Sequence, residues 1–294
     1  MLEIENKISK VAFSTDKFLN SYLREKSFKP TLLSAIKYGL FSGGKKFRSF
    51  VIKNTAKIFN LNENEIIKVG AAVECMHSYS LIHDDLPSMD NDDIRRGKPS
   101  AHKVFGESTA ILAGNSLLTL SFEILGSDIL RLKKNIKSDL IFSLAESAGY
   151  KGIAGGQYLD LAYERKKVGK NKIIDMQNKK TGKLMGFCCE AAAIIANKNK
   201  DRKFLRDIGV DIGLLFQITD DLLDIYGDKG KTGKPTKQDL KKGKATLIRE
   251  IGVNKTIEFA YALSDKIIRI LKKKYGTKAN DLIGSVEFLL TRDR

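Results

Sequence analysis

Long stretches of this sequence contain no proline and repeat apolar residues at helical spacing. The 294-residue chain has four prolines, at Pro30, Pro87, Pro99 and Pro235, so more than 100 consecutive residues lack one. Proline disrupts a helix interior, and a chain this poor in proline is therefore suited to long helices. Apolar residues recur three and four positions apart, and no alternating run of strand length lies between them. We expect an all-α protein, built as one large helical bundle with a central cleft.

The expected helices are interrupted by two polar segments. We expect helices over residues 4–22, 30–41, 62–84, 109–125, 136–150, 172–196, 204–226, 254–274 and 279–290, with about ten or more in all. Residues 84–100 and 228–244 break the helical pattern, and each segment follows a long helix. Loops at the ends of core helices often carry the chemistry of a bundle. Length alone favours two domains, but no Ser/Gly-rich linker is present, and we expect a single domain over residues 1–294.

Cysteine usage and the N-terminus favour the cytoplasm. Cys75, Cys188 and Cys189 form no C-x-x-C pair, which argues against a disulfide scaffold or a zinc site and favours a reducing compartment. The first ten residues, MLEIENKISK, carry two glutamates where a secretory signal is basic. The longest small-apolar run, Ala191 to Ala196, is far shorter than the roughly 18 residues that span a bilayer. We expect a cytoplasmic protein without stable membrane insertion.

The sequence is strongly basic. It has 52 Lys and Arg residues against 35 Asp and Glu residues, a net charge of +17. Such an excess suits nucleic acid, an anionic lipid surface or an anionic small molecule. The lysine clusters are short and not interleaved with aromatic residues, and tryptophan is absent, so we expect no nucleic-acid partner. A non-catalytic helical protein that binds polyanions or a membrane surface stays open as an alternative.

Five aspartates lie within ten positions at the end of the expected helix 62–84. They are Asp84, Asp85, Asp90, Asp92 and Asp93. Adjacent carboxylates repel one another, so this density is costly without a bound cation. An all-oxygen set suits Mg²⁺, which usually takes one or two carboxylates together with substrate phosphate oxygens. The alternative is a capped helix end followed by an acidic surface loop.

A second aspartate motif lies inside an otherwise apolar helix. The sequence FQITDDLLD contains Asp220, Asp221 and Asp224. Asp220 and Asp224 are one turn apart and project from the same helix face. Carboxylates in an apolar helix carry a burial penalty unless they meet cations. We therefore expect the two aspartate motifs to share one cleft with Mg²⁺ between them.

A third group of motifs is basic. The sequence GGKKFR, residues 43–48, places cations behind a glycine pair at an expected helix start, where backbone N–H groups attract anions. Arg95 and Arg96 follow the first aspartate cluster. Lys180 interrupts an uncharged helix face, and Lys234 lies in the second polar segment. Each pair alone is typical of a surface, but arginine and lysine beside acidic motifs favour diphosphate binding.

Six motifs in a fixed order resemble a known family. They are GGKKFR at 43–48, ECMHSYSLIHDDLPSMDNDDIRRGKPSAH at 74–102, GGQYLDL at 155–161, KTG at 180–182, FQITDDLLD at 216–224 and KTGKPTKQDLKKGKAT at 231–246. In these motifs the chain resembles the short-chain trans-isoprenyl diphosphate synthases, most closely the bacterial farnesyl diphosphate synthases, or geranyltranstransferases. A lone DDxxD would be a weak signal because terpene cyclases carry one too, but their second motif is an Asn/Ser/Glu triad rather than DDLLD.

The resemblance implies an isoprenoid-synthase bundle in which up to three Mg²⁺ ions, or alternatively Mn²⁺, bridge an allylic diphosphate. The implied metal ligands are Asp84, Asp85, Asp90, Asp220, Asp221 and Asp224. The implied contacts of the allylic diphosphate are Arg95, Lys180, Thr181, Gln217 and Lys234. The implied contacts of isopentenyl diphosphate are Lys45, Arg48, His77 and Arg96. The implied catalytic set is Asp84, Asp90, Asp220, Lys180 and Arg95.

The resemblance also implies the reaction and the assembly. A prenyltransferase of this kind condenses isopentenyl diphosphate with dimethylallyl or geranyl diphosphate, and the family suggests a homodimer. Tyr79 and Ser80, five and four residues before Asp84, occupy positions that line the product tunnel in the family. A tyrosine there resembles enzymes that stop at the fifteen-carbon product, farnesyl diphosphate. The alternatives are that Tyr79 is an ordinary core aromatic and that the enzyme makes geranylgeranyl diphosphate.

Overall fold

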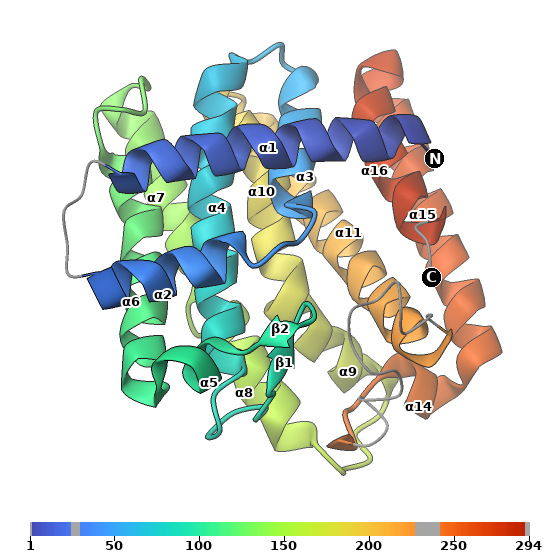
Figure 1. Cartoon of the computed structure of the whole chain (residues 1–294). Helices are drawn as coiled ribbons and strands as arrows, with labels where there is room; N and C mark the ends of the chain where they lie inside the picture. Colours follow the sequence, from blue (N-terminus) through green and yellow to red (C-terminus); the bar gives the residue numbers. More distant parts are fainter. Residues whose placement is uncertain (1, 25–29, 227–241, 292–294) are drawn as a thin grey trace. The chain divides into compact units, whose positions relative to one another are not determined.

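The computed structural model describes residues 2–24, 30–226 and 242–291, and these ranges are almost entirely helical (Figure 1). The α-helices are α1 (Leu2–Arg24), α2 (Pro30–Phe41), α3 (Phe47–Lys57), α4 (Glu63–Asp84), α5 (Ala101–Phe105), α6 (Glu107–Gly126), α7 (Lys134–Ala148), α8 (Ile153–Tyr163), α9 (Lys170–Gln177), α10 (Lys183–Ile195), α11 (Asn199–Tyr226), α14 (Leu247–Ile251), α15 (Val253–Tyr275) and α16 (Asn280–Thr291). The π-helical turn η1 (Asn178–Gly182) joins α9 to α10, and the 3₁₀ turn η2 (Gly276–Ala279) precedes α16. The all-α prediction is confirmed.

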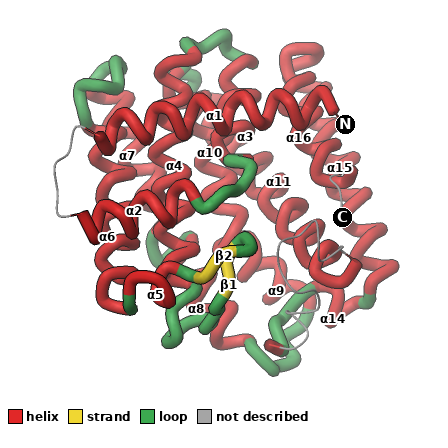
Figure 2. The backbone as a smooth tube through the Cα atoms, in the orientation of Figure 1, coloured by secondary structure: helices red, strands yellow, loops and turns green. Residues whose placement is uncertain are grey.

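A single hairpin is the only β-structure within the described ranges (Figure 2). Its strands are β1 (Ile94–Arg95) and β2 (Lys98–Pro99), which pair antiparallel. Arg96 and Gly97 between them both have positive φ angles, 53° and 74°. Two such residues form the tight turn whose twist matches that of a hairpin. The hairpin fixes two arginines, Arg95 and Arg96, at the end of the first aspartate segment.

The chain divides into two compact units. Unit 1 comprises residues 1–4, 54–61 and 142–294, and unit 2 comprises residues 5–53 and 62–141. In unit 2, α4 packs along α6, α2 contacts both of these helices, and α5 contacts α6 and α2. Asn62 caps α4, as expected, because its side chain accepts hydrogen bonds from the backbone N–H groups of Asn64 and Glu65. The cap fixes the start of the helix that ends at Asp84.

In unit 1, α10 packs along α11 with very close backbones. A Cβ atom added to Gly209 of α11 would lie 2.4 Å from the carbonyl oxygen of Met185. One added to Gly213 would lie 2.6 Å from the Cα of Gly182. Only glycine permits such an approach, so the small residues of α11 hold its middle against α10 and the π-helical turn. This packing sets the position of the second aspartate motif relative to Lys180 and its neighbours.

Several sequence predictions need correction. The predicted helix 172–196 is wrong as a single element, because α9 ends at Gln177 and the π-helical turn separates it from α10. Only the start of α3 was predicted, at the GGKKFR motif. Helices α5, α8 and α14 were not predicted, and neither was the hairpin. The polar segment 228–244 lies mostly outside the described residues.

Helix α6 bears on the membrane prediction. Within the described ranges it is the one helix long and apolar enough to cross a membrane, although 44% of its apolar window is buried inside the structure. Polar residues such as Asn115, Ser116 and Thr119 interrupt the apolar residues of α6, so it contains no long uninterrupted apolar run. The buried face of α6 packs against α4. A buried core helix can be as long and apolar as a membrane-spanning one, so the length and composition of α6 do not distinguish the two.

A buried glutamate ties three helices of unit 1 together. Glu190 of α10 is fully buried, and Ser143 donates a 2.7 Å hydrogen bond to its Oε2. Arg206 donates to both carboxylate oxygens at 2.7 and 2.6 Å, and Arg202 donates to Oε1 at 3.1 Å. Burial opposes ionisation, but these hydrogen bonds, led by those of Arg206, hold the pKa of Glu190 below its ordinary value.

Replacing Glu190 with glutamine should therefore destabilise the fold in a pH-dependent way. A carboxyl whose pKa is lowered by folding stabilises the protein above the ordinary glutamate pKa and loses that contribution as pH falls through the lowered value. We expect Glu190→Gln to lower the melting temperature at pH 7 by roughly 3–6 °C, with a difference that shrinks below about pH 4.5. Calorimetry of both proteins across this range tests it. An equal difference at every pH would contradict the electrostatic explanation.

Candidate functional site

The first aspartate motif forms a tight turn at the end of α4, in unit 2. The backbone N–H of Asp90 donates to the carbonyl of Asp84 at 2.9 Å, and that of Asp92 donates to the carbonyl of Asp85 at 3.2 Å. The turn therefore brings Asp84 and Asp90, six residues apart in sequence, next to each other. Both residues are partly exposed. Their carboxylates remain accessible to a cation.

Asp85 points in a different direction from Asp84. It is 2% exposed and forms a bidentate ion pair with Arg95 of the hairpin, whose Nε lies 2.9 Å from Oδ1 and 3.1 Å from Oδ2. Arg95 Nη2 also donates to Asp85 Oδ1. A paired arrangement of this kind fixes both the position and the plane of the guanidinium. In this structure the Asp85 carboxylate orients Arg95. The predicted role of Asp85 as a metal ligand stays a prediction, and its pairing with Arg95 is a structural role that also explains the residue.

The side chain of Arg96 packs against the glycine pair, Gly43 and Gly44, that precedes α3. Arg96 Nη1 donates to the carbonyl of Gly43. Gly44 has a φ of +102°, and a Cβ atom there would lie 2.5 Å from Arg96 Cζ. Glycine is required at this position both for the backbone angle and for the guanidinium beside it. The GGKKFR and Arg-Arg-Gly motifs therefore meet within unit 2.

His77, on α4, lies near several cationic side chains from other segments of unit 2. Desolvation of its ring holds the pKa of His77 well below its ordinary value, and the neighbouring positive charges lower it further. These charges belong to Arg48, Arg96, Lys46 and Arg95. The ring is therefore neutral at pH 7, in a region of positive potential that suits an anion.

The two lysines of the GGKKFR motif have different surroundings. Lys45 is exposed, whereas Lys46 is 5% exposed and donates to the carbonyl of Leu40 at 2.5 Å. Lys46 Nζ also lies 3.5 Å from the carboxylate of Asp16 on α1. Lys46 thus closes the end of α2, while Lys45 keeps the exposure that the predicted contact with a diphosphate needs. Arg48, in the first turn of α3, is 9% exposed.

Tyr79 and Ser80 lie on α4 before the aspartate turn. The ring of Tyr79 stacks edge-on against His83, with 5.1 Å between ring centroids. Burial, and secondly the negative charge of Asp84, raise the pKa of the Tyr79 hydroxyl. The Ser80 hydroxyl donates to the carbonyl of His77 in its own helix. Tyr79 therefore has a fixed orientation and lies within the electrostatic influence of the aspartate turn.

Lys180 and Thr181 lie in the π-helical turn of unit 1. A π-turn widens the helix by one residue and often occurs at functional sites. Gly156 of α8 allows it to pack closely, because a Cβ atom at that position would lie 2.1 Å from the backbone nitrogen of Lys180. The second glycine of the GGQYLDL motif, Gly156, thus has a structural explanation. The turn presents Lys180 and Thr181 toward α8 and α11.

A chain of hydrogen bonds joins the π-helical turn to the second aspartate motif. The Thr181 hydroxyl donates to Gln217 Oε1 at 2.8 Å, and Gln217 Nε2 donates to Asp221 Oδ1 at 2.9 Å. Gln177 Nε2 donates to the other oxygen of Asp221 at 3.0 Å. Asp221 is 4% exposed. Like Asp85, Asp221 orients neighbouring polar side chains in this structure, and its predicted metal role is likewise untested.

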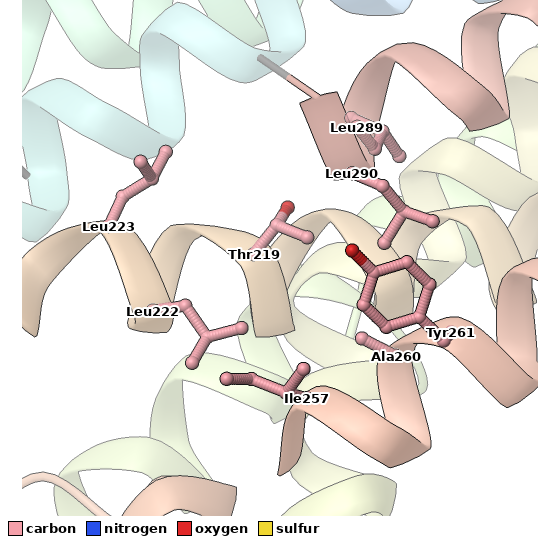
Figure 3. A pocket seen from close by; sticks show the side chains of 8 residues that line it. All are labelled: Thr219, Leu222, Leu223, Ile257, Ala260, Tyr261, Leu289 and Leu290. Carbon is pink, nitrogen blue, oxygen red and sulfur yellow. The ribbon is translucent and has the colours of Figure 1, made fainter. Parts of the chain in front are cut away.

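The remaining aspartates of the second motif are accessible. Asp220 and Asp224 are partly exposed and lie one turn apart on α11, which confirms their predicted common helix face. Other side chains of α11, including Thr219 and Leu222, line a small and mainly apolar pocket with α15 and α16 (Figure 3). The helix thus has a packed side and a side that carries carboxylates.

Each unit supplies a pair of carboxylates of the type that fits Mg²⁺. Asp84 and Asp90 are brought together by one backbone hydrogen bond, and Asp220 and Asp224 share one face of α11. All four donors are carboxylates, the ligand type that Mg²⁺ prefers. In the ranges that the structure describes, no three His, Cys, Asp or Glu side chains converge closely enough to hold an ion by themselves. An Mg²⁺ ion usually takes one or two carboxylates and completes its coordination with substrate phosphate oxygens and water. Lys234 lies outside the described residues.

Sequence reasoning missed Asp160, the acidic residue of the GGQYLDL motif. It is 5% exposed, and its Oδ2 accepts hydrogen bonds from Lys180 at 2.7 Å and from Lys244 at 2.9 Å. The signal available in the sequence was a lone aspartate in an apolar helical segment, which requires a cationic partner. Its partners could not be identified because they are 20 and 84 residues away in sequence.

Comparison with known proteins places these residues in a family context. Residues 29–282 match the family described as polyprenyl synthetase. The farnesyl diphosphate synthase of Bacillus subtilis is 41% identical over 232 residues, which cover 78% of this chain and 78% of the relative.

Solved structures resemble the whole chain. A FPP/GFPP synthase from Zymomonas mobilis is 36% identical with a TM-score of 0.86, over 98% of this chain and 99% of that one. A geranyltransferase from Helicobacter pylori, complexed with magnesium and isoprenyl diphosphate, is 29% identical with a TM-score of 0.83. That similarity covers 97% of this chain and 98% of the other.

The close packing at Gly156 predicts that alanine at this position lowers the stability of the fold, unlike alanine at an uncrowded helical glycine. Glycine-to-alanine changes usually stabilise a helix by up to about 1 kcal/mol. Gly284→Ala on α16 should be neutral or stabilising, because the nearest atom to its added Cβ is 3.8 Å away. Gly156→Ala should destabilise by about 1–3 kcal/mol, since the added Cβ meets the backbone of Lys180. Chemical denaturation of the two variants measures the difference, and equal effects would contradict the proposed packing constraint.

Proposed function

The chain belongs to the polyprenyl synthetase family, and from this premise we propose that it condenses isopentenyl diphosphate with dimethylallyl or geranyl diphosphate to give (E,E)-farnesyl diphosphate. The enzyme is a polyprenyl transferase, and its relatives include a farnesyl diphosphate synthase that matches over 78% of both chains. The observation that carries the proposal is the pairing of an accessible aspartate turn with a group of cations in unit 2. A turn of carboxylates beside arginines suits a metal-bound diphosphate.

Isopentenyl diphosphate would bind among the cations of unit 2. We assign its diphosphate to Lys45, Arg48, His77 and Arg96. The neutral ring of His77 can donate one hydrogen bond without adding a fourth charge. The hydrogen bond from Arg96 to Gly43 fixes the arginine and the glycine loop together, which limits the entropy lost on binding.

The allylic diphosphate would bind through Arg95, Lys180, Thr181, Gln217 and Lys234. Arg95 is oriented by Asp85, and Thr181 and Gln217 are oriented through Asp221. Asp84, Asp90 and Asp220 are the favoured ligands of up to three Mg²⁺ ions, for which Mn²⁺ is the alternative. Asp224, one turn after Asp220 on α11, is a further ligand, and Asp85 and Asp221 are weaker candidates. Bound Mg²⁺ would neutralise negative charge on the diphosphate as it leaves.

The chemistry follows from this arrangement of charges. Arg95 and Lys180 stabilise the charge that grows on the allylic diphosphate as its C–O bond breaks. The double bond of isopentenyl diphosphate attacks the resulting allylic cation and forms a new carbon–carbon bond. A proton is then lost to give the trans double bond, and inorganic diphosphate is released. Apolar helix faces must keep water from the cation, which water would otherwise quench.

We further propose that the enzyme works in the cytoplasm as a homodimer. The exposed side chains of α6 include Ile111 and Leu112, which are 41% and 54% exposed. A dimer interface on α6 would cover these two apolar side chains. A dimer would also account for the apolar composition of α6 without membrane insertion.

Metal-dependent condensation is the direct test of the function. Purified protein incubated with isopentenyl and geranyl diphosphate should form farnesyl diphosphate only when Mg²⁺ is present. Asp84→Ala and Asp220→Ala should each lower the rate by roughly 100-fold or more, because each removes a proposed metal ligand. Asp207→Ala, which removes an exposed carboxylate of α11, serves as control and should keep the wild-type rate. No product with wild-type protein would refute the function, and full activity of both alanine variants would refute the assigned ligands.

Product length tests the role of Tyr79. If its ring limits the space for the growing chain, Tyr79→Ala should shift the product toward twenty carbons or more. Tyr150→Ala, which removes a tyrosine that is 79% exposed, should leave the product unchanged. Chromatography of the dephosphorylated products distinguishes the two. An active Tyr79→Ala enzyme that still stops at fifteen carbons would show that another residue limits the chain.

A further inference from the structure

A partly buried cluster of two lysines and two carboxylates lies beside the π-helical turn in unit 1. Asp160 of α8 accepts hydrogen bonds from Lys180 and Lys244 on the same oxygen, Oδ2. Lys244 also forms a 2.8 Å ion pair with Glu164, at the end of α8. Only Lys180 in this cluster has a role in the reaction proposed above. The other three residues need a separate explanation.

The cluster is built from three segments that are fixed by their backbones. The backbone of Lys180 lies against Gly156, one helical turn before Asp160 on α8. The segment that carries Lys244 is tied to the end of α8, because the backbone N–H of Arg165 donates to the carbonyl of Gly243 at 2.8 Å. Arg249 Nη1 donates to the same carbonyl at 2.9 Å. The position of each charged group is therefore set by the fold.

The two lysines differ in how much solvent they meet. The side chain of Lys244 is 9% exposed and that of Lys180 is 25% exposed, while that of Asp160 is 7% exposed. Lys244 is therefore the more buried of the two lysines, and Lys180 is the more accessible. An ammonium group has three N–H donors, and the contact with Asp160 engages one of them and orients Lys180.

The charges explain why two lysines share one carboxylate. Burial alone would raise the pKa of Asp160, but Lys180 and Lys244 together hold it below its ordinary value. Lys244 is shared between Asp160 and Glu164, so the four charges sum to zero. The contact with Asp160 therefore serves to hold the ammonium group of Lys180 in one place.

We propose that Asp160 is a positioning residue for the allylic diphosphate. Asp160 fixes the ammonium group of Lys180, and the more buried Lys244 anchors Asp160. The inference rests on the function proposed above and extends it to two residues that contact no substrate. It predicts that the cluster affects the allylic substrate selectively. Isopentenyl diphosphate, assigned to the cations of unit 2, should not sense it.

Steady-state kinetics of Asp160→Asn provide the test. This change keeps the size of the side chain and removes its charge. We expect KM for geranyl diphosphate to rise about 10–50-fold, the loss associated with one hydrogen bond to a charged group, with KM for isopentenyl diphosphate unchanged. The matched control is Asp175→Asn, which breaks a 2.7 Å ion pair with Lys179 at the exposed start of the same turn. It should change neither KM.

A double-mutant cycle identifies the route of the effect. If Asp160 acts through Lys180, adding Asp160→Asn to Lys180→Met should change the allylic KM less than twofold. Lys244→Met should raise the same KM, and Lys244→Arg should restore most of it because the charge is retained. Effects of Asp160→Asn and Lys180→Met that multiply independently would overturn the proposal, as would an equal rise in KM for both substrates.

Two further results keep the inference separate from stability and from the function itself. If Asp160→Asn does not fold, Asp160→Glu retains the charge but moves it by one methylene, and an unchanged allylic KM in that variant would overturn the proposal. Wild-type protein that forms no prenyl product would refute the proposed function. An active wild type with an Asp160→Asn variant that behaves like Asp175→Asn would refute only the positioning role.

Discussion

Ionised carboxylates inside a helical core must be paired, and this requirement determines how the aspartates of this protein are used. Six acidic side chains are buried in the described parts of the chain, and each accepts a hydrogen bond from a lysine, arginine, amide, hydroxyl or backbone N–H group. An unpaired buried charge would cost several kcal/mol. Within each aspartate motif the second residue, Asp85 or Asp221, meets this requirement, whereas the first stays partly exposed. One step along a helix is a rotation of about 100°, so neighbouring aspartates face different surroundings and do different work.

Long elements with clear periodicity were predictable from sequence, and short or irregular ones were not. Asn62 and the helix ending at Asp84 followed from a capping residue and a long apolar period. The hairpin escaped because its strands have two residues each. Helix α8 escaped because Gly155 and Gly156 weaken its local preference for helix, and tertiary packing against the π-helical turn overrides that preference. The π-turn itself leaves the apolar pattern of residues 172–196 nearly unchanged, so the pattern predicted one helix.

In the candidate site too, residues that belong to local motifs were predictable from sequence, whereas partners from distant segments were not. The sequence identified the aspartates and Lys180 by motif, but it could not distinguish Lys45 from Lys46, which differ in burial because the backbone turns between them. It gave no role to Asp160, since the lysines that bind it come from distant segments. Residue types and motif order thus indicate the chemistry, whereas the pairing that orients each group depends on the tertiary fold. The assigned contacts with substrate and metal stay predictions.

The buried carboxylates are paired with opposite charges, whereas the cations of unit 2 are gathered close to one another. Arg48 and Lys46 are buried and surround a neutral His77 together with Arg95 and Arg96, although like charges held close together destabilise a fold. Carboxylates offset part of this cost, because Asp16 lies near Lys46 and the charge of Glu74 acts on Arg96. The remaining positive potential is fixed before any ligand arrives. A diphosphate that enters such a site meets oriented charges and need not reorganise them, so the protein bears the cost of assembling the site when it folds rather than when it binds substrate.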